Sequence, residues 1–155
     1  NLDLGEKFGV NICLADALGV KNPVLSELGE CMFTGELESE TDIHDFAKLA
    51  KKNLDCKGLR YTDIKDRVKK VAVSSGAGGS NVFDAALAGV DVLVTGEIKH
   101  HEIIAANSLG IDIIDAGHFK SEDVVILPLV NRLSEKFSDI IFTKSQSCDD
   151  MIKFI

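Results

Sequence analysis

The sequence lacks the features that would place it in or across a membrane. No apolar run approaches the roughly 20 residues that a membrane-spanning helix needs. No basic segment followed by an apolar one stands at the N-terminus, where a secretory signal would lie. Both absences favour a cytosolic protein with no membrane partner. The chain starts at Asn1 without a methionine, within what resembles a strand-to-helix transition, which we interpret as a truncated or processed start.

Positive charge and paired cysteines are also scarce. There are 17 lysines and arginines against 25 acidic residues, a formal net charge of -8. Because non-specific nucleic-acid affinity comes from basic residues that displace counterions, no nucleic-acid partner is expected, whereas an acidic surface does not discourage cations. No C-x-x-C pair is present, so we predict reduced, mostly buried thiols instead of a zinc knuckle or redox motif. The cysteines are Cys13, Cys31, Cys56 and Cys148.

Several motifs of nucleotide binding and nucleophilic catalysis are missing as well. The chain has no G-x-S-x-G sequence and no cysteine next to a histidine. The segment Gly76-Ala-Gly-Gly79-Ser80 matches neither a P-loop nor a G-x-G-x-x-G fingerprint. A tight strand-to-helix turn that uses the freedom of glycine at positive φ is therefore the favoured interpretation. A phosphate cradle at the start of the following helix stays open as the alternative.

From residue 68 the chain alternates apolar strands with amphipathic helices. This alternation predicts an α/β fold, a layered sheet that is largely parallel in this half, with residues 1–155 as a single domain. Pro128 predicts a kink or a later start in the last helix. The expected strands are 68–74, 90–95, 111–114 and 139–142, and the expected helices are 80–88 with Ser80 as the N-cap, 98–109 and 121–137.

The first half of the chain shows a sparser pattern. A helix is expected over 10–18, with Gly19 as its stop, and a short strand over 31–34. A second helix is expected over 42–53, with Ser39 or Thr41 as its cap.

His118 and Glu122 follow the third strand of the alternating half. An imidazole nitrogen and a carboxylate four residues apart converge on one ion when the turn between them is helical. The alternative is that His118 caps the helix and Glu122 meets its positive N-terminus. Gly117 leaves room at the strand end and Asp115 lies one turn of chain away, which favours the metal site.

The segment Thr95 to His101 follows the second of these strands and carries further polar residues. Glu97 and Lys99 are candidates to orient ligands or bind a substrate anion, and an exposed polar first turn is the alternative. Adjacent histidines in a helix point about 100° apart, so His100 and His101 do not bind one ion together. In this interpretation one of the two histidines faces the site and the other is solvated.

Three segments together resemble the Nif-three-like family, the dinuclear-metal-centre proteins also described as GTP cyclohydrolase I type 2 homologues. They are Val71-Ala-Val-Ser-Ser-Gly-Ala-Gly-Gly-Ser80, Asp91-Val-Leu-Val-Thr-Gly-Glu-Ile-Lys-His-His101 and Asp115-Ala-Gly-His-Phe-Lys-Ser-Glu122. The opening Asn1-Leu2-Asp3 resembles the end of the family's histidine-to-aspartate segment, followed by its Gly-x-Asn helix at Gly9-Val-Asn11. The resemblance covers nearly the whole chain, which it identifies as the C-terminal portion of such a protein.

The resemblance implies a centre of two divalent ions, Zn, Mn or Fe. By motif position Asp3 would be the bridging carboxylate, and His118 and Glu122 would be further ligands. The family's remaining ligands are a histidine pair upstream of Asp3, on a segment that this sequence does not contain. This chain alone is therefore expected to bind metal weakly or not at all, unless a further segment or subunit completes the site. The family also implies a homo-oligomer, a hexamer built from dimers.

These observations support a metal-dependent hydrolase acting on an unknown small molecule as the leading hypothesis. Asp3, His118 and Glu122 would hold the ions, and Glu97 or His101 would transfer protons. The alternative is a metal-stabilised regulatory or scaffold protein that acts through protein partners. Nucleotide binding at the segment 76–80 is a third hypothesis.

Overall fold

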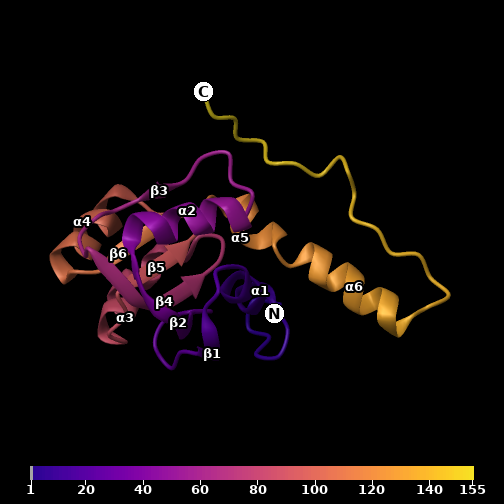
Figure 1. The fold of residues 1–155 in the computed structure, drawn as a ribbon, viewed down its shortest axis with the longest axis horizontal. Helices are drawn as coiled ribbons and strands as arrows, with labels where there is room; N and C mark the ends of the chain where they lie inside the picture. The colour runs from indigo at the N-terminus through magenta and orange to yellow at the C-terminus, as the bar shows by residue number, and fades with distance from the viewer. Residues whose placement is uncertain (1) are drawn as a thin grey trace.

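The computed structural model describes residues 2–155 and shows a mixed six-stranded sheet within them, in the order β1-β2-β4-β5-β6-β3. Asn1, part of the segment that resembles the family's histidine-to-aspartate region, lies outside the described residues. Figure 1 shows the sheet between helices, with a long C-terminal excursion to one side. The strands are β1 (Lys21–Leu25), β2 (Phe33–Asp42), β3 (Arg60–Tyr61), β4 (Arg67–Ser74), β5 (Val92–Thr95) and β6 (Asp112–Asp115).

The centre of the sheet is parallel, as the alternating half of the sequence predicts. β4 pairs in parallel with β5, and β5 with β6, while β1, β2 and β3 pair antiparallel with their neighbours. Parallel strands that follow one another through crossovers place their C-terminal ends at one edge of the sheet. The segments after Ser74, Thr95 and Asp115 therefore meet at that edge.

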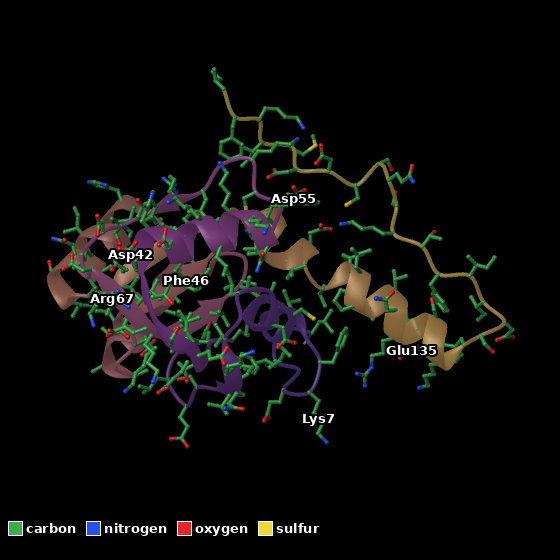
Figure 2. All side chains as sticks on the ribbon, viewed as in Figure 1. Lys7, Asp42, Phe46, Asp55, Arg67 and Glu135 are labelled. Atoms are coloured by element: carbon green, nitrogen blue, oxygen red, sulfur yellow. The ribbon has the colours of Figure 1, made fainter. Side chains whose placement is uncertain are left out.

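Successive side chains of the parallel strands point to opposite faces of the sheet and pack into two separate core layers. Val71 and Val73 pack with α1 (Val10–Ala17) and α2 (Ile43–Asn53). Ala72, between them, faces the opposite layer, which holds residues of α3 (Val82–Leu87) and α4 (His100–Leu109). Strands covered on both faces are apolar throughout, which explains their continuous apolar runs. Figure 2 shows Phe46, a fully buried residue of α2, between that helix and the strands.

Two aspartates at the beginnings of β5 and β6 fix the segment that leads into β4. The fully buried Asp112 carboxylate accepts hydrogen bonds from Thr62 Oγ1 at 2.8 Å and from the backbone N–H groups of Ile64 and Lys65 at 2.9 Å. Asp91 accepts from Lys65 Nζ at 2.6 Å and from two backbone N–H groups. Partial burial raises the pKa of the Asp91 carboxyl. These hydrogen bonds and the Lys65 charge together lower that pKa by more, so it lies below its usual value of 3.8.

The structure corrects several expectations for local elements. Asp42, and neither Ser39 nor Thr41, caps α2, because its carboxylate accepts from the N–H groups of residues 44 and 45. Ser80 is not the cap of α3, since a 3₁₀ helix, η1 (Gly78–Asn81), precedes that helix. The strands β1 and β3 were not expected from the sequence. They are edge strands that take their register from a partner strand, and β1 carries a proline in its middle.

The single helix expected over 121–137 is two helices. α5 (His118–Asp123) ends before a turn, and α6 (Ile126–Lys136) begins two residues before Pro128, so the proline stands in a first turn where no N–H is needed. A later helix start is one of the two outcomes that the proline predicts. The expected strand 139–142 is wrong, because those residues have no strand partner within the described chain.

Beyond Val125, little of the chain is buried. α6 has no buried residue, and Figure 1 shows it and the following segment extending away from the layers. No helix among residues 2–155 has both the length and the apolar character to cross a membrane. All four cysteines are free, as expected, although only Cys13 and Cys56 are buried.

Candidate metal centre

Three loops at the C-terminal edge of the parallel strands are tied directly to one another. Gly96, after β5, donates its N–H to the carbonyl of Gly76, after β4, at 3.0 Å. Ala116, after β6, donates to the carbonyl of Thr95 at 2.9 Å. Ser121 of α5 joins them, since its Oγ accepts from the Gly76 N–H and donates to the His118 carbonyl, both at 2.9 Å. The strand ends thus form one connected surface.

His118 stands on this surface between two carboxylates. Its Nδ1 lies 2.6 Å from Glu97 Oε1, and its Nε2 lies 3.2 Å from Glu122 Oε1. A carboxylate that accepts a hydrogen bond from Nδ1 fixes the imidazole tautomer and leaves the Nε2 lone pair for a metal. Two ligands that each lie about 2 Å from one ion are about 3 Å apart, so Nε2 and Oε1 stand at the separation that a shared ion requires.

The same neighbours set the protonation of His118. Burial lowers the pKa of the imidazole, but the hydrogen bond to Glu97 and the charges of Glu122 and Glu97 raise it by more, so the net pKa lies above 6.5. A metal ligand must be neutral imidazole, so an ion binding here competes with this proton. If this pair held an ion, its affinity would therefore be greater at higher pH.

Gly76 provides the space in which the pair sits. Its φ is +61°, as the tight-turn interpretation of the glycine segment requires. A Cβ at this position would lie 2.5 Å from Glu122 Oε1 and 3.1 Å from His118 Nε2. Gly76 therefore permits the turn and also lets the backbone approach both candidate ligands.

Gly78 and Gly79 have a different reason to be glycine. Neither has a positive φ, but a Cβ on Gly78 would lie 2.4 Å from Ser74 Oγ. A Cβ on Gly79 would lie 2.5 Å from Glu102 Oε2 and 2.7 Å from the Glu97 carbonyl oxygen. Close packing against the end of β4, the loop after β5 and the first turn of α4 is thus what excludes side chains here.

Asp3, the third predicted ligand, does not join the His118–Glu122 pair. Asp3 and Glu122 both line a hollow of about 240 Å³ on one side of the glycine segment, while His118 lines a different one. Among residues 2–155, no group of three or more histidine, cysteine, aspartate or glutamate side chains is placed to hold an ion. The described chain thus offers two close donors, and the ligand role of Asp3 stays a prediction.

The candidate site residues other than the metal ligands, which are Glu97, Lys99 and His101, fall into two groups. Glu97 and Lys99 line the hollow of about 550 Å³ that His118 also lines. His101 is exposed on the first turn of α4 and is not among the residues that line this hollow. The structure therefore brings two of the three candidates to the His118 side of the site.

Two buried polar residues that support the site, Glu102 and Asn11, were given no role in the interpretation of the sequence. Glu102, only 7% exposed, accepts from the Lys99 N–H at 2.7 Å and lines the larger hollow. A glutamate three residues after a helix cap is a recognisable signal, which was available at Lys99. Asn11, fully buried, donates to the carbonyls of Asp3 and Cys31 and accepts from the Ser75 N–H at 2.8 Å. A polar side chain among apolar residues of α1 would have indicated it.

Comparison with known proteins gives consistent matches over most of the chain. The model of the Duf34/NIF3 (NGG1p interacting factor 3) family matches residues 1–149. A Clostridium perfringens protein named GTP cyclohydrolase 1 type 2 homolog is 33% identical over 158 residues, which cover 96% of this chain and 60% of that protein. This chain therefore spans less than two thirds of that relative.

Solved structures match the fold closely. A hypothetical protein of Staphylococcus aureus superposes with a TM-score of 0.88 at 23% identity, covering 99% of this chain and 66% of its own. The protein ybgI, whose structure is described as of unknown function, gives a TM-score of 0.78 at 31% identity, covering 86% of this chain and 54% of its own. These likenesses support the layered α/β arrangement around the strand ends.

Proposed function

Because this chain belongs to the Duf34/NIF3 family, we propose that it is part of a divalent-metal-binding protein in which His118 and Glu122 are ligands. The observation that carries the proposal is the placement of His118. Its Nε2 lies 3.2 Å from a carboxylate oxygen of Glu122, and its Nδ1 is held by Glu97. That arrangement matches a metal-binding histidine oriented by a carboxylate behind it.

A centre of two ions, with Asp3 as the bridging carboxylate, is the fuller form of this proposal. Its support is that Asp3 and Glu122 line one hollow while His118 lines the adjacent one. Two donors do not saturate even one ion, since divalent zinc takes four ligands and magnesium or manganese more. Zn, Mn and Fe all accept the imidazole and carboxylate donors present here.

Metal-dependent hydrolysis of a small molecule is the activity that we propose. The name of the C. perfringens relative refers to a cyclohydrolase, which is a hydrolytic enzyme. When bound, a pair of divalent ions lowers the pKa of water and stabilises negative charge that develops on a substrate oxygen. Glu97 holds the His118 ring in place, and Lys99 provides a positive charge in the same hollow.

Loss of His118 is expected to abolish specific metal binding. The measurement is the metal content after dialysis against Zn²⁺ or Mn²⁺. It is made on this chain and on a longer protein of which this chain is a part. His118→Ala is expected to lower bound metal to background, because it removes one of the two close donors. Glu97→Gln is expected to weaken affinity by about 10- to 100-fold, because it disturbs the orienting hydrogen bond.

His100→Ala is the matched control, since it removes an exposed histidine that lines neither hollow. If His118→Ala leaves the metal content of the longer protein unchanged, the ligand assignment is wrong. Hydrolysis itself is tested with phosphoester and cyclic-amidine substrates under Mn²⁺, Zn²⁺ and Fe²⁺. No turnover under any of the three ions would argue for the regulatory or scaffold alternative.

We also propose that the chain self-associates through α6. Apolar residues follow one face of this helix, yet none of them is buried within the chain. Leu133→Glu is therefore expected to reduce the mass measured by sedimentation equilibrium toward the 16.7 kDa of one chain. Ser134→Glu adds the same charge to the neighbouring exposed position and is expected to leave the mass unchanged. A single-chain mass for the unaltered protein at every concentration would contradict the proposal.

A further inference from the structure

The larger hollow beside His118 has the size and position of a small-molecule site. Its volume is about 550 Å³, within the range of roughly 300–1,000 Å³ that ligand pockets occupy. Residues 96–99 after β5 and residues 117–118 after β6 line it. Residues 58–60, which lead into β3, and the C-terminal residues Ile152 and Phe154 line it as well.

The carboxylates of this hollow already have partners within the chain. Asp115 accepts from Arg60 Nε at 3.0 Å and from the Gly117 N–H at 3.1 Å. Glu97 Oε1 is hydrogen-bonded to His118 Nδ1. Glu102 accepts from the Lys99 N–H, at the N-terminus of α4, where the helix dipole favours a negative charge. None of the three therefore requires a cationic ligand.

The cations of the hollow have unused capacity. Lys99 is exposed, and among residues 2–155 no carboxylate lies within 4.0 Å of its Nζ. Arg60 directs both of its bonded nitrogens, Nε and Nη2, at the single oxygen Asp115 Oδ2. Its side chain is 70% exposed, so further guanidinium donors are open to solvent. Hydrogen-bond donors of two cationic side chains, Lys99 and Arg60, thus remain available in one hollow.

Apolar side chains form a further part of the lining, an apolar wall, and the distant C-terminus supplies part of it. Phe154 packs on Gly58, where a Cβ would lie 2.4 Å from the ring atoms Cδ1 and Cε1. Ile152 and Phe154 remain 61% and 53% exposed, so each offers apolar surface to a ligand. Leu59 and Ile98 continue the wall. Aromatic and aliphatic surface of this kind favours a ligand with an apolar ring.

We propose that this hollow binds a small organic anion that carries an apolar ring, with the anionic group held by Lys99 and Arg60 and the ring against Phe154. The inference deepens the proposed function, since such a molecule would lie beside His118. It names the chemistry of the substrate and does not require a bound metal ion. The site can therefore be tested with chelator present.

The test is calorimetric titration of the full chain in EDTA with three probes: phenylphosphonate, methylphosphonate and benzyl alcohol. Phenylphosphonate is expected to bind at least about tenfold more tightly than either of the others, because only it uses both the cations and the apolar wall. Lys99→Met is expected to weaken both phosphonates by about tenfold, the scale of one lost charged contact. Phe154→Ala is expected to reduce phenylphosphonate to the affinity of methylphosphonate.

Lys7→Met is the matched control, because Lys7 is exposed at the lower edge of the view in Figure 2 and is not among the residues of this hollow. It is expected to leave all three affinities unchanged. Equal binding of the three probes, or unaltered phosphonate binding by Lys99→Met, would overturn the inference. If phenylphosphonate fails to bind while His118→Ala still removes metal, the anion site is wrong and the metal centre stands. If phenylphosphonate binds as expected while His118→Ala leaves the metal content unchanged, the metal centre is wrong and the anion site stands.

Discussion

Gly96→Ala is expected to lower the free energy of unfolding by about 2–3 kcal/mol, the upper part of the range for overpacking a close-packed site. A Cβ at Gly96 would lie 2.4 Å from Ser121 Oγ, 2.7 Å from His118 Cα and 2.8 Å from the Gly76 carbonyl oxygen. Two of these atoms are backbone, so relief requires the loops after β4 and β6 to separate. Urea unfolding followed by circular dichroism measures the loss.

The same separation would displace His118 from Glu122, so the variant is also expected to bind less metal in the longer protein. Gly89→Ala is the matched control, because Gly89 has a φ of +71° and nothing within 4 Å of its added Cβ. That control is expected to lose only about 1 kcal/mol, from left-handed strain. A loss at Gly96 no larger than the loss at Gly89 would show that the three loops are not held in contact.

Asp112→Ala is expected to destabilise the protein by about 3 kcal/mol. The wild-type carboxylate is fully buried and accepts three hydrogen bonds from residues 62–65, so alanine leaves their donors without a partner. Each lost partner of a buried group costs about 1–3 kcal/mol. Because the segment is partly exposed, water can hydrogen-bond to some of the donors and reduce this cost. The measurement is the midpoint of urea unfolding at a fixed slope.

Asp112→Asn distinguishes the hydrogen bonds from the volume of the side chain. Asparagine keeps the size and one acceptor oxygen, so about 1–2 kcal/mol is expected to be lost. Asp63→Ala, at an exposed position of the same segment, is expected to change stability by less than about 0.5 kcal/mol. If Asp112→Ala behaves like Asp63→Ala, the buried carboxylate does not anchor the segment.

The parallel strands β4, β5 and β6 were predictable because their signals are local. Strands that are covered on both faces have continuous apolar runs, and each is separated from the next by a helix, so their parallel pairing follows from chain connectivity. The short edge strands β1 and β3 carry no such run. Their pairing with β2 and β6 depends on contacts with residues far along the chain.

Some residues of the candidate site were likewise predictable from local sequence, and others were not. The four-residue spacing of His118 and Glu122 is a property of one helical turn, and the structure places their side chains 3.2 Å apart. Glu97 was only one polar residue among several in its segment until the strand order set it 2.6 Å from His118. Arg60 and Phe154 carried no signal at all, yet both line the hollow beside that histidine.

Local sequence patterns predict the alternation of strands and helices, the glycine turn after β4 and the close spacing of His118 and Glu122, because each depends on residues within a few positions of one another. The folded chain adds which loops meet, that Asp3 and His118 line different hollows, and that the C-terminal segment supplies part of the lining of one of them. Those features depend on strand order and on packing between segments that lie far apart along the chain, which local periodicity does not encode.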